Sequence, residues 1–176
     1  NVPACSVTSN VVTITVNALP ATPTITAGGP TTFCAGGSVL LTSSVATGYL
    51  WSPGGAITQA ITATASGSYT VEITDANGCK ATSAATVVTV NANPTVSVTP
   101  VGPFTFCAGG SQLLTATAAG KAVLLYQWQN GGVNISGATA STYSATATGA
   151  YRCIVTDGNV PACSVTSNVV TITVNA

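Results

Sequence analysis

The chain has 176 residues, of which three are Lys or Arg, three are Asp or Glu and none is His. So few charges exclude nucleic acid as a partner, because binding to phosphates requires a basic surface that releases counterions. Polar residues, Gly or Pro interrupt every apolar run before it reaches the roughly 18 residues of a membrane helix, so we expect no membrane insertion. A surface this neutral hardly repels its own copies, and we expect self-association.

The beginning of the chain reappears at its end. Residues 1–18 and residues 159–176 both read NVPACSVTSNVVTITVNA, at an offset of 158 positions. We interpret this identity as recent duplication of a 158-residue unit, which makes the chain an excerpt from a longer array of near-identical repeats. Residues 1–18 are then the terminal strand of the preceding repeat, and a secretion signal is expected outside this segment.

A second, more diverged repeat divides the unit itself. Residues 32–38 and residues 105–111 both read TFCAGGS, and both halves end in Thr-Val-Asn-Ala. We therefore predict two modules, module A at 19–92 and module B at 93–176. The second residue of each module is Pro, which limits bending at the joints and favours a semi-rigid string.

Strand patterns fill both modules. Polar and apolar residues alternate at 13–16 and 171–174, as in a half-buried strand. Turn residues, such as those at 75–78 and 130–132, recur about every ten residues, which is the spacing of a β-sandwich. The sequence predicts an all-β fold of two tandem sandwiches with Greek-key connections, both with the same strand order. The strands expected in module B are 94–100, 111–118, 123–129, 133–135, 141–145, 149–156 and 163–174.

Short motifs around the aromatic residues resemble known repeats. They are YQW at 126–128, GVNISGA at 132–138 and AYRC at 150–153 in module B, and YLWS at 49–52, GSYTV at 67–71 and TDANGC at 74–79 in module A. The first set resembles immunoglobulin-like repeats of large bacterial surface proteins. The second resembles the tandem repeats of giant secreted proteins of Bacteroidota. The resemblance implies an immunoglobulin-like fold, export by the type IX system, and a role as an adhesin or a cell-surface filament.

Four aromatic residues are candidates for the structural core. Trp51 and Trp128 each lie on the third strand of a module, where an immunoglobulin-like sandwich buries one Trp. We prefer this interpretation to an exposed ligand platform. Tyr69 and Tyr151 follow at the start of the sixth strand, which suits a tyrosine corner with a buried ring and a hydroxyl bonded to local backbone.

The cysteines are expected to form disulfides. The chain has no CxxC motif and no His, so zinc is not expected, and disulfides indicate an oxidising compartment outside the cytoplasm. We predict that Cys34 pairs with Cys79 and that Cys107 pairs with Cys163. Each bond would close a loop of about 50 residues and contribute on the order of 4 kcal/mol. Cys5, the counterpart of Cys163, would bond the Cys107 of the preceding repeat.

Cys153 is the odd cysteine of the repeat. It stands where an immunoglobulin domain has a cysteine on its sixth strand, but Ala116 or a neighbour replaces the partner on the second strand. Three states are open for it: a buried free thiol, a bond to Cys163 across the strands, and a bridge to another chain.

No residue pattern predicts catalysis, a metal or a cofactor. Without His there is no base to activate a Ser or Cys nucleophile. Asp75 and Asp157 lie in turns of different modules, and a calcium site needs more carboxylates than either module has. The CAGG motif at 34–37 lacks the Lys and the helix of a phosphate loop. We therefore expect no enzyme.

The leading hypothesis is a structural repeat unit of an extracellular filament or stalk, with other copies of itself as partner. Sequence-identical repeats give every junction the same geometry, and a repeated contact builds a fibre. One alternative is the spacer of a large adhesin that binds another cell or a surface. A second alternative is a carbohydrate-binding accessory module, whose partner would be a glycan. In each case the expected location is the cell surface or the exterior.

Overall fold

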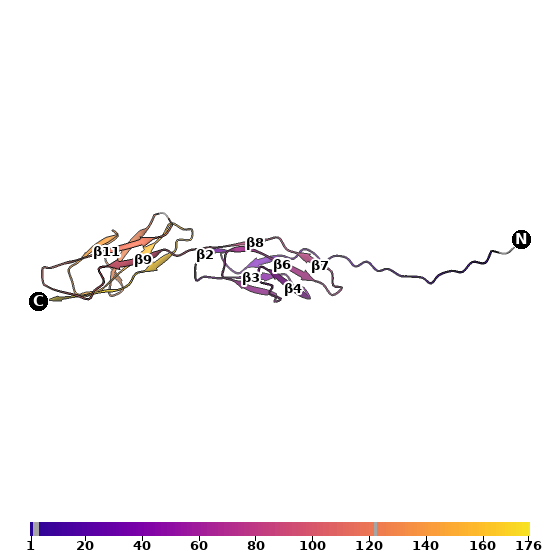
Figure 1. Cartoon of the computed structure of the whole chain (residues 1–176), viewed down its shortest axis with the longest axis horizontal. Coiled ribbons are helices and arrows are strands. Elements are labelled where there is room, and N and C mark those ends of the chain that lie inside the picture. Colours follow the sequence, from indigo (N-terminus) through magenta and orange to yellow (C-terminus); the bar gives the residue numbers. More distant parts are fainter. Residues whose placement is uncertain (2–3, 122) are drawn as a thin grey trace.

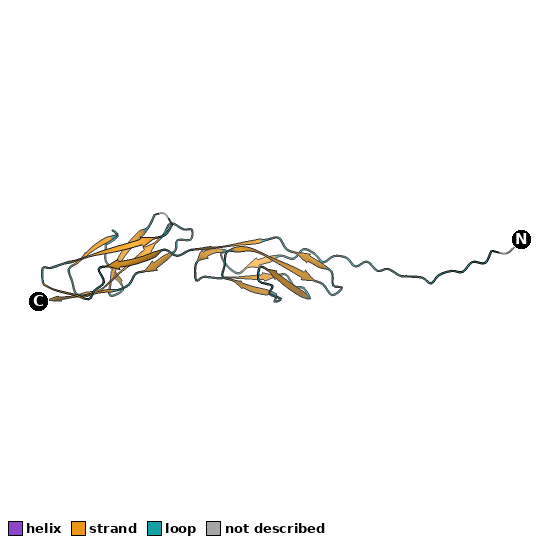
Figure 2. Cartoon of the chain, viewed as in Figure 1, coloured by secondary structure: helices purple, strands orange, loops and turns teal. Residues whose placement is uncertain are grey.

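The computed structural model describes residues 1, 4–121 and 123–176. Two β-modules follow one another along the long axis, and the first residues extend from one end, so the termini lie at opposite ends of the molecule (Figure 1). All regular structure in the described residues is strand (Figure 2). None of these residues belongs to a helix that is long and apolar enough to cross a membrane.

Module A is a sandwich of two sheets around one hydrophobic core. The first sheet has the order β1 (Ile25–Ala27), β3 (Val39–Ser43) and β5 (Ala60–Ala63). The second has the order β2 (Thr32–Cys34), β8 (Thr86–Asn91), β6 (Gly67–Thr74) and β4 (Gly48–Ser52), with β7 (Lys80–Thr82) paired to β6. Along β6 every second residue is buried, as the two-residue period of a sheet with one covered face requires.

Module B repeats this arrangement with its own core. One sheet has the order β9 (Thr95–Thr99), β11 (Gln112–Ala119) and β14 (Thr142–Ala145). The other has the order β10 (Phe104–Cys107), β17 (Val170–Asn175), β15 (Gly149–Thr156), β12 (Leu125–Asn130) and β13 (Val133–Asn134), with β16 (Ser164–Thr166) paired to β15. The fold is therefore all-β, with two tandem immunoglobulin-like sandwiches.

Two features of the strands differ from the sequence prediction. The strand expected at 163–174 is divided into β16 and β17, because the Ser167 N–H donates to the Cys153 carbonyl and the Ser167 hydroxyl accepts from the Cys153 N–H. In addition, each module has an unpredicted strand, β2 or β10, which pairs in parallel with the last strand, β8 or β17. This second difference decides where the cysteines lie.

Both tryptophans are enclosed in the cores. Trp51 on β4 is 1% exposed and Trp128 on β12 is 0% exposed. Each indole N–H donates to a backbone carbonyl, Thr58 at 2.8 Å for Trp51 and Ala140 at 2.9 Å for Trp128. The rings therefore fill the sandwiches with their polar atoms satisfied.

Tyr69 on β6 and Tyr151 on β15 make the same local bond. The Tyr69 hydroxyl donates to the Ala65 carbonyl at 3.0 Å, and the Tyr151 hydroxyl donates to the Ala147 carbonyl at 2.9 Å. Each bond reaches back four residues and ties the preceding loop to the strand, which is the geometry of a tyrosine corner.

The segment at 1–18 has no regular structure in its described residues, 1 and 4–18, whereas residues 2 and 3 lie outside them. Its apolar side chains are exposed: Val12 is 75% exposed and Ile14 is 83% exposed. In the identical segment of module B, the counterparts Val170 and Ile172 are both fully buried in β17. The same sequence is thus found in two environments within one chain.

Candidate functional site

The groups that could carry chemistry are sparse and scattered. The described part of the chain contains no cluster of three or more His, Cys, Asp or Glu side chains that could hold a metal ion. One salt bridge is present there, between Lys80 and Glu72 at 2.6 Å, and it is partly exposed to solvent. The most elaborate arrangement of polar and reactive side chains lies at the joint between the modules.

The joint contains a disulfide between Cys34 and Cys163. The predicted pairs Cys34–Cys79 and Cys107–Cys163 are therefore wrong. The bond joins residues 129 positions apart, and its Cα atoms are separated by 5.6 Å, a typical distance for a disulfide. It connects the end of β2 in module A to the turn before β16 in module B.

The unpredicted strand explains this correction. Because β2 runs parallel to β8, Cys34 lies opposite Asn91 at the end of module A that adjoins module B. Cys79 follows β6, which runs the opposite way, so it lies at the far end of the module. The two are separated by at least the length of β6, which is roughly 25 Å for eight residues, and a disulfide cannot span that distance.

One signal for these two strands is present in the amino-acid sequence. Thr32-Phe-Cys34 and Phe104-Thr-Phe-Cys107 alternate polar and apolar residues, as strands do. Because Cys5 is the counterpart of Cys163, its expected partner in the preceding repeat changes from Cys107 to Cys34.

A buried carboxylate holds the turn that presents Cys163. Asp157 is 3% exposed, and its Oδ1 accepts the backbone N–H groups of Asn159 and Cys163, both at 3.0 Å. The Asp157 N–H donates in turn to the Cys163 carbonyl at 2.9 Å. Partial desolvation raises the pKa of this carboxyl, but these hydrogen bonds, the Asn159 side chain and the charge of Lys121 together hold its pKa below the ordinary value.

Asparagines complete the contact between the modules. The Asn91 amide donates to the carbonyls of Val160 at 3.4 Å and Pro161 at 3.5 Å. The Asn159 amide donates to the Ala92 carbonyl at 3.4 Å, which gives a contact in the opposite direction. The joint is thus a small polar contact clamped by one covalent bond.

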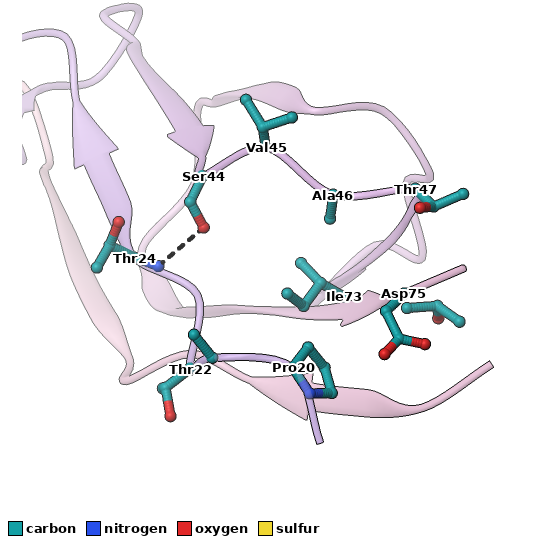
Figure 3. Close-up of a pocket in the computed structure, with 11 residues that line it drawn as sticks. Pro20, Thr22, Thr24, Ser44, Val45, Ala46, Thr47, Ile73 and Asp75 are labelled. Carbon is teal, nitrogen blue, oxygen red and sulfur yellow. Dashed lines mark hydrogen bonds between the residues drawn. The ribbon is translucent and has the colours of Figure 1, made fainter. Parts of the chain in front are cut away.

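A groove of about 610 Å³ lies at the free end of module A (Figure 3). The segment at 20–24, the loop at 44–47 and the end of β6 form its walls, and a hydrogen bond of 3.3 Å from the Thr24 N–H to Ser44 Oγ links two of them. Its lining has one charged residue, Asp75, and no aromatic ring. This arrangement offers no stacking surface for a sugar and no pair of groups for acid–base catalysis.

Comparison with known proteins gives one match to a family model over part of the chain and several structural likenesses. Residues 96–176 match a family model described as a domain of unknown function, DUF8696. No curated protein matches the chain. Among solved structures, three N-terminal domains of the bacteriophage RB49 highly immunogenic outer capsid protein (Hoc) are 23% identical with a TM-score of 0.41, over 86% of this chain and 59% of that one.

Two further solved structures are extracellular domains 3–5 of Drosophila OTK and the N-terminal four Ig domains of Dscam1 isoform 9.44. The first is 18% identical with a TM-score of 0.44, over 82% of this chain and 59% of that one. The second is 15% identical with a TM-score of 0.40, over 88% of this chain and 46% of that one. The chain therefore spans little more than half of the length of the first two structures and less than half of the third.

Proposed function

We propose that the chain is a structural repeat unit of an extracellular filament or stalk, in which copies follow one another end to end. The observation that carries the proposal is the pair of identical segments at 1–18 and 159–176. The second segment supplies the buried face of β17, whereas the first exposes the same apolar side chains to solvent. Pairing of its backbone and burial of its apolar side chains would stabilise such a segment most if it completed the sheet of another copy.

In the proposed array, residues 1–18 occupy in the preceding module B the place that residues 159–176 occupy here. Covalent continuity from one repeat to the next accounts for the complete identity of the two segments. A strand donated between separate short subunits would produce the same burial. The motifs at 49–52, 67–71 and 74–79 support an origin among the giant secreted proteins of Bacteroidota, and the disulfide supports a location outside the cytoplasm.

Electrophoresis of the native material under denaturing and reducing conditions tests the proposal. Very large chains are the expected result. A band near 17.1 kDa, the mass of these 176 residues, would contradict the continuous array and favour donated strands. Electron microscopy of the same material gives the second readout: a filament shows ordered contacts between neighbouring chains, whereas an array without them would act as the spacer of an adhesin.

The spacer is the second candidate, and the rod-like succession of modules with a clamped joint supports it (Figure 1). A carbohydrate-binding module has less support, because both tryptophans are enclosed in the cores and the groove of module A has no aromatic wall. Specific binding in a glycan-array screen would place the carbohydrate-binding module above the spacer.

A further inference from the structure

Two cysteines outside the joint lie at the two outer ends of the pair of modules. Cys107 is exposed at the end of β10, on the C-terminal end of module B, and Cys79 is half-buried in the turn after β6, on the N-terminal end of module A. Neither belongs to the disulfide between the modules. In the repeat, Cys107 is the counterpart of Cys34, and Cys79 is the counterpart of Cys163.

Cys107 is held as Cys34 is held. Each ends a strand that runs parallel to the last strand of its module, with Cys34 opposite Asn91 and Cys107 opposite Asn175. The N–H of the residue after each cysteine donates to the carbonyl of that asparagine at 2.8 Å. The glycine three positions after the cysteine donates to the cysteine carbonyl, at 2.9 Å in module A and 3.0 Å in module B. The C-terminal end of module B therefore repeats the geometry that module A has at the joint.

Cys79 is presented as Cys163 is presented. Asp75 Oδ1 accepts the Cys79 N–H at 2.8 Å, and Asp157 Oδ1 accepts the Cys163 N–H at 3.0 Å. Both aspartates donate their own N–H to the cysteine carbonyl at 2.9 Å. In both turns, the backbone N–H of the asparagine two positions after the aspartate also donates to the aspartate Oδ1, at 2.8 Å in module A and 3.0 Å in module B. The N-terminal end of module A therefore offers the turn that module B offers to Cys34.

We propose that Cys107 of each copy forms a disulfide with Cys79 of the following copy, so that every joint between modules is covalently stapled. The inference rests on the proposed function, because it requires a following copy at the C-terminal end of module B. The partner is a second copy of this chain, and it would approach with the end of module A that carries the groove beside Asp75 (Figure 3).

The bond forms by thiol–disulfide exchange with a disulfide oxidant. One thiol loses its proton, attacks the oxidant and releases half of it as a thiol, which leaves a mixed disulfide. The second cysteine then attacks the mixed disulfide as a thiolate and releases the other half. In total the two cysteines lose two protons and two electrons, and the oxidant is reduced to two thiols. The exposed Cys107 is accessible for the first attack.

The two kinds of joint differ in their non-covalent contacts. The turn from Asp75 to Cys79 is two residues shorter than the turn from Asp157 to Cys163. It has no counterpart of Val160 and Pro161, whose carbonyls accept the asparagine amide at the existing joint. The disulfide between copies therefore contributes a larger share of the stability of its joint than the Cys34–Cys163 bond contributes to the stability of the joint within the chain.

The cysteines of the repeat are then accounted for with one exception. Two kinds of joint use Cys34, Cys79, Cys107 and Cys163, and Cys153 is left in the core of module B with 0% exposure. Native material that is unfolded without reduction should accordingly show one reactive thiol per 158-residue repeat. Three thiols per repeat would contradict the proposal.

A tandem chain tests the pairing directly. It consists of residues 1–176 followed by a second copy of 19–176, and it is refolded with oxidised glutathione as the disulfide oxidant. The test variant carries Cys79→Ala in the first copy and Cys107→Ala in the second, which leaves the pair at the inner joint. The control variant carries Cys107→Ala in the first copy and Cys79→Ala in the second, which leaves the same two cysteines at the outer ends.

We expect the test variant to have two fewer thiols than the control, and to yield a peptide that links Cys107 to Cys79 under non-reducing conditions. Equal numbers of thiols in the two variants would overturn the proposal. The proposal would also be overturned if monomeric chains of both variants yielded the linked peptide. The two variants have the same composition, so a general folding defect affects both. Because the chain is built in tandem, the result concerns the joint alone, and the size of the native material separately tests the proposed function.

Discussion

A cysteine in the core of module B illustrates how burial decides the role of a residue. Cys153 lies opposite Trp128, and Val71 lies opposite Trp51 at the same position of module A; both Cys153 and Val71 are fully buried. Burial raises the pKa of the Cys153 thiol, more than a backbone hydrogen bond from Gln127 lowers it. The thiol is therefore a small apolar group that replaces a valine, and it is poorly suited to exchange with an oxidant.

Lowering the pH is predicted to destabilise module B through Asp157. Its pKa in the folded chain lies below the value of about 3.9 expected for an unfolded chain, owing to the hydrogen bonds in its turn. A carboxyl whose pKa is lowered by folding stabilises the fold above the unfolded-state pKa. This stabilisation is lost as the pH falls through the folded-state pKa.

Thermal unfolding of the chain between pH 7 and pH 2 measures this effect. The midpoint of the natural chain should fall more steeply below about pH 4 than that of Asp157→Asn, because the amide does not titrate there. Glu72→Gln is the control, since it removes a partly exposed carboxylate of module A and should keep the steep fall. Parallel curves for the natural chain and Asp157→Asn would contradict the assignment.

At the scale of single strands, the neighbourhood of a segment matters more than its own sequence. Residues 159–176 contain β16 and β17, because β15 and β10 offer backbone partners and the core of module B receives the apolar side chains. At the start of the chain, the described part of the identical segment, residues 1 and 4–18, contains no strand, and its apolar side chains are exposed. Strand propensity alone does not form a strand.

The duplicated segment provides a matched pair of substitutions. Ile172→Ala removes a fully buried side chain and should lower the free energy of unfolding of module B by about 2–5 kcal/mol. Ile14→Ala makes the identical change where the side chain is 83% exposed, and should change the stability of the single chain by less than about 0.5 kcal/mol. Urea unfolding measures both. Equal effects of the two substitutions would contradict the assignment of the two environments.

The strand prediction succeeded where the signal was local. The sixth strand of module B was expected at 149–156, and β15 has these bounds. Alternation, flanking Gly and the following Asp turn are all readable along the chain. The cysteine pairing was wrong because it depended on β2 and β10. A three- or four-residue strand becomes stable only through its partner, and the partner lies more than 50 residues away in the sequence.

At the scale of the whole molecule, the disulfide at the joint determines how freely the modules move. Each module has its own core, and the chain passes between them through Ala92 and Asn93. Three of the hydrogen bonds across the joint are long, at 3.4 Å and 3.5 Å, and a fourth, from the Asn93 amide to the Ala35 carbonyl, measures 3.0 Å. All four are exposed to solvent, so they contribute little rigidity. The covalent bond is the main restraint on bending.

Removal of this bond should loosen the rod without unfolding its modules. The double variant Cys34→Ala/Cys163→Ala is expected to have a smaller mean radius of gyration and a broader distribution of shapes in small-angle X-ray scattering. The chain-entropy model attributes about 4–5 kcal/mol to a loop of this length, so the variant should also unfold at lower urea concentration.

Reduction of the natural chain should reproduce the scattering of the double variant. Cys153→Val, which changes a buried cysteine away from the joint, should keep the scattering of the natural chain. If the double variant and the natural chain scatter alike, non-covalent contacts hold the joint and the disulfide is not its main restraint.

Properties that depend on composition and on short-range pattern can be inferred from the amino-acid sequence alone. The alternation of polar and apolar residues, the spacing of turns and the two Trp–Tyr pairs were sufficient for an all-β fold of two similar sandwiches. Which cysteines meet depends on the folded arrangement, because a disulfide requires Cα atoms within about 7 Å and strand direction places Cys34 and Cys79 at opposite ends of one module. The pairing of Cys34 with Cys163 is thus a property of the contact between modules, which no single module encodes.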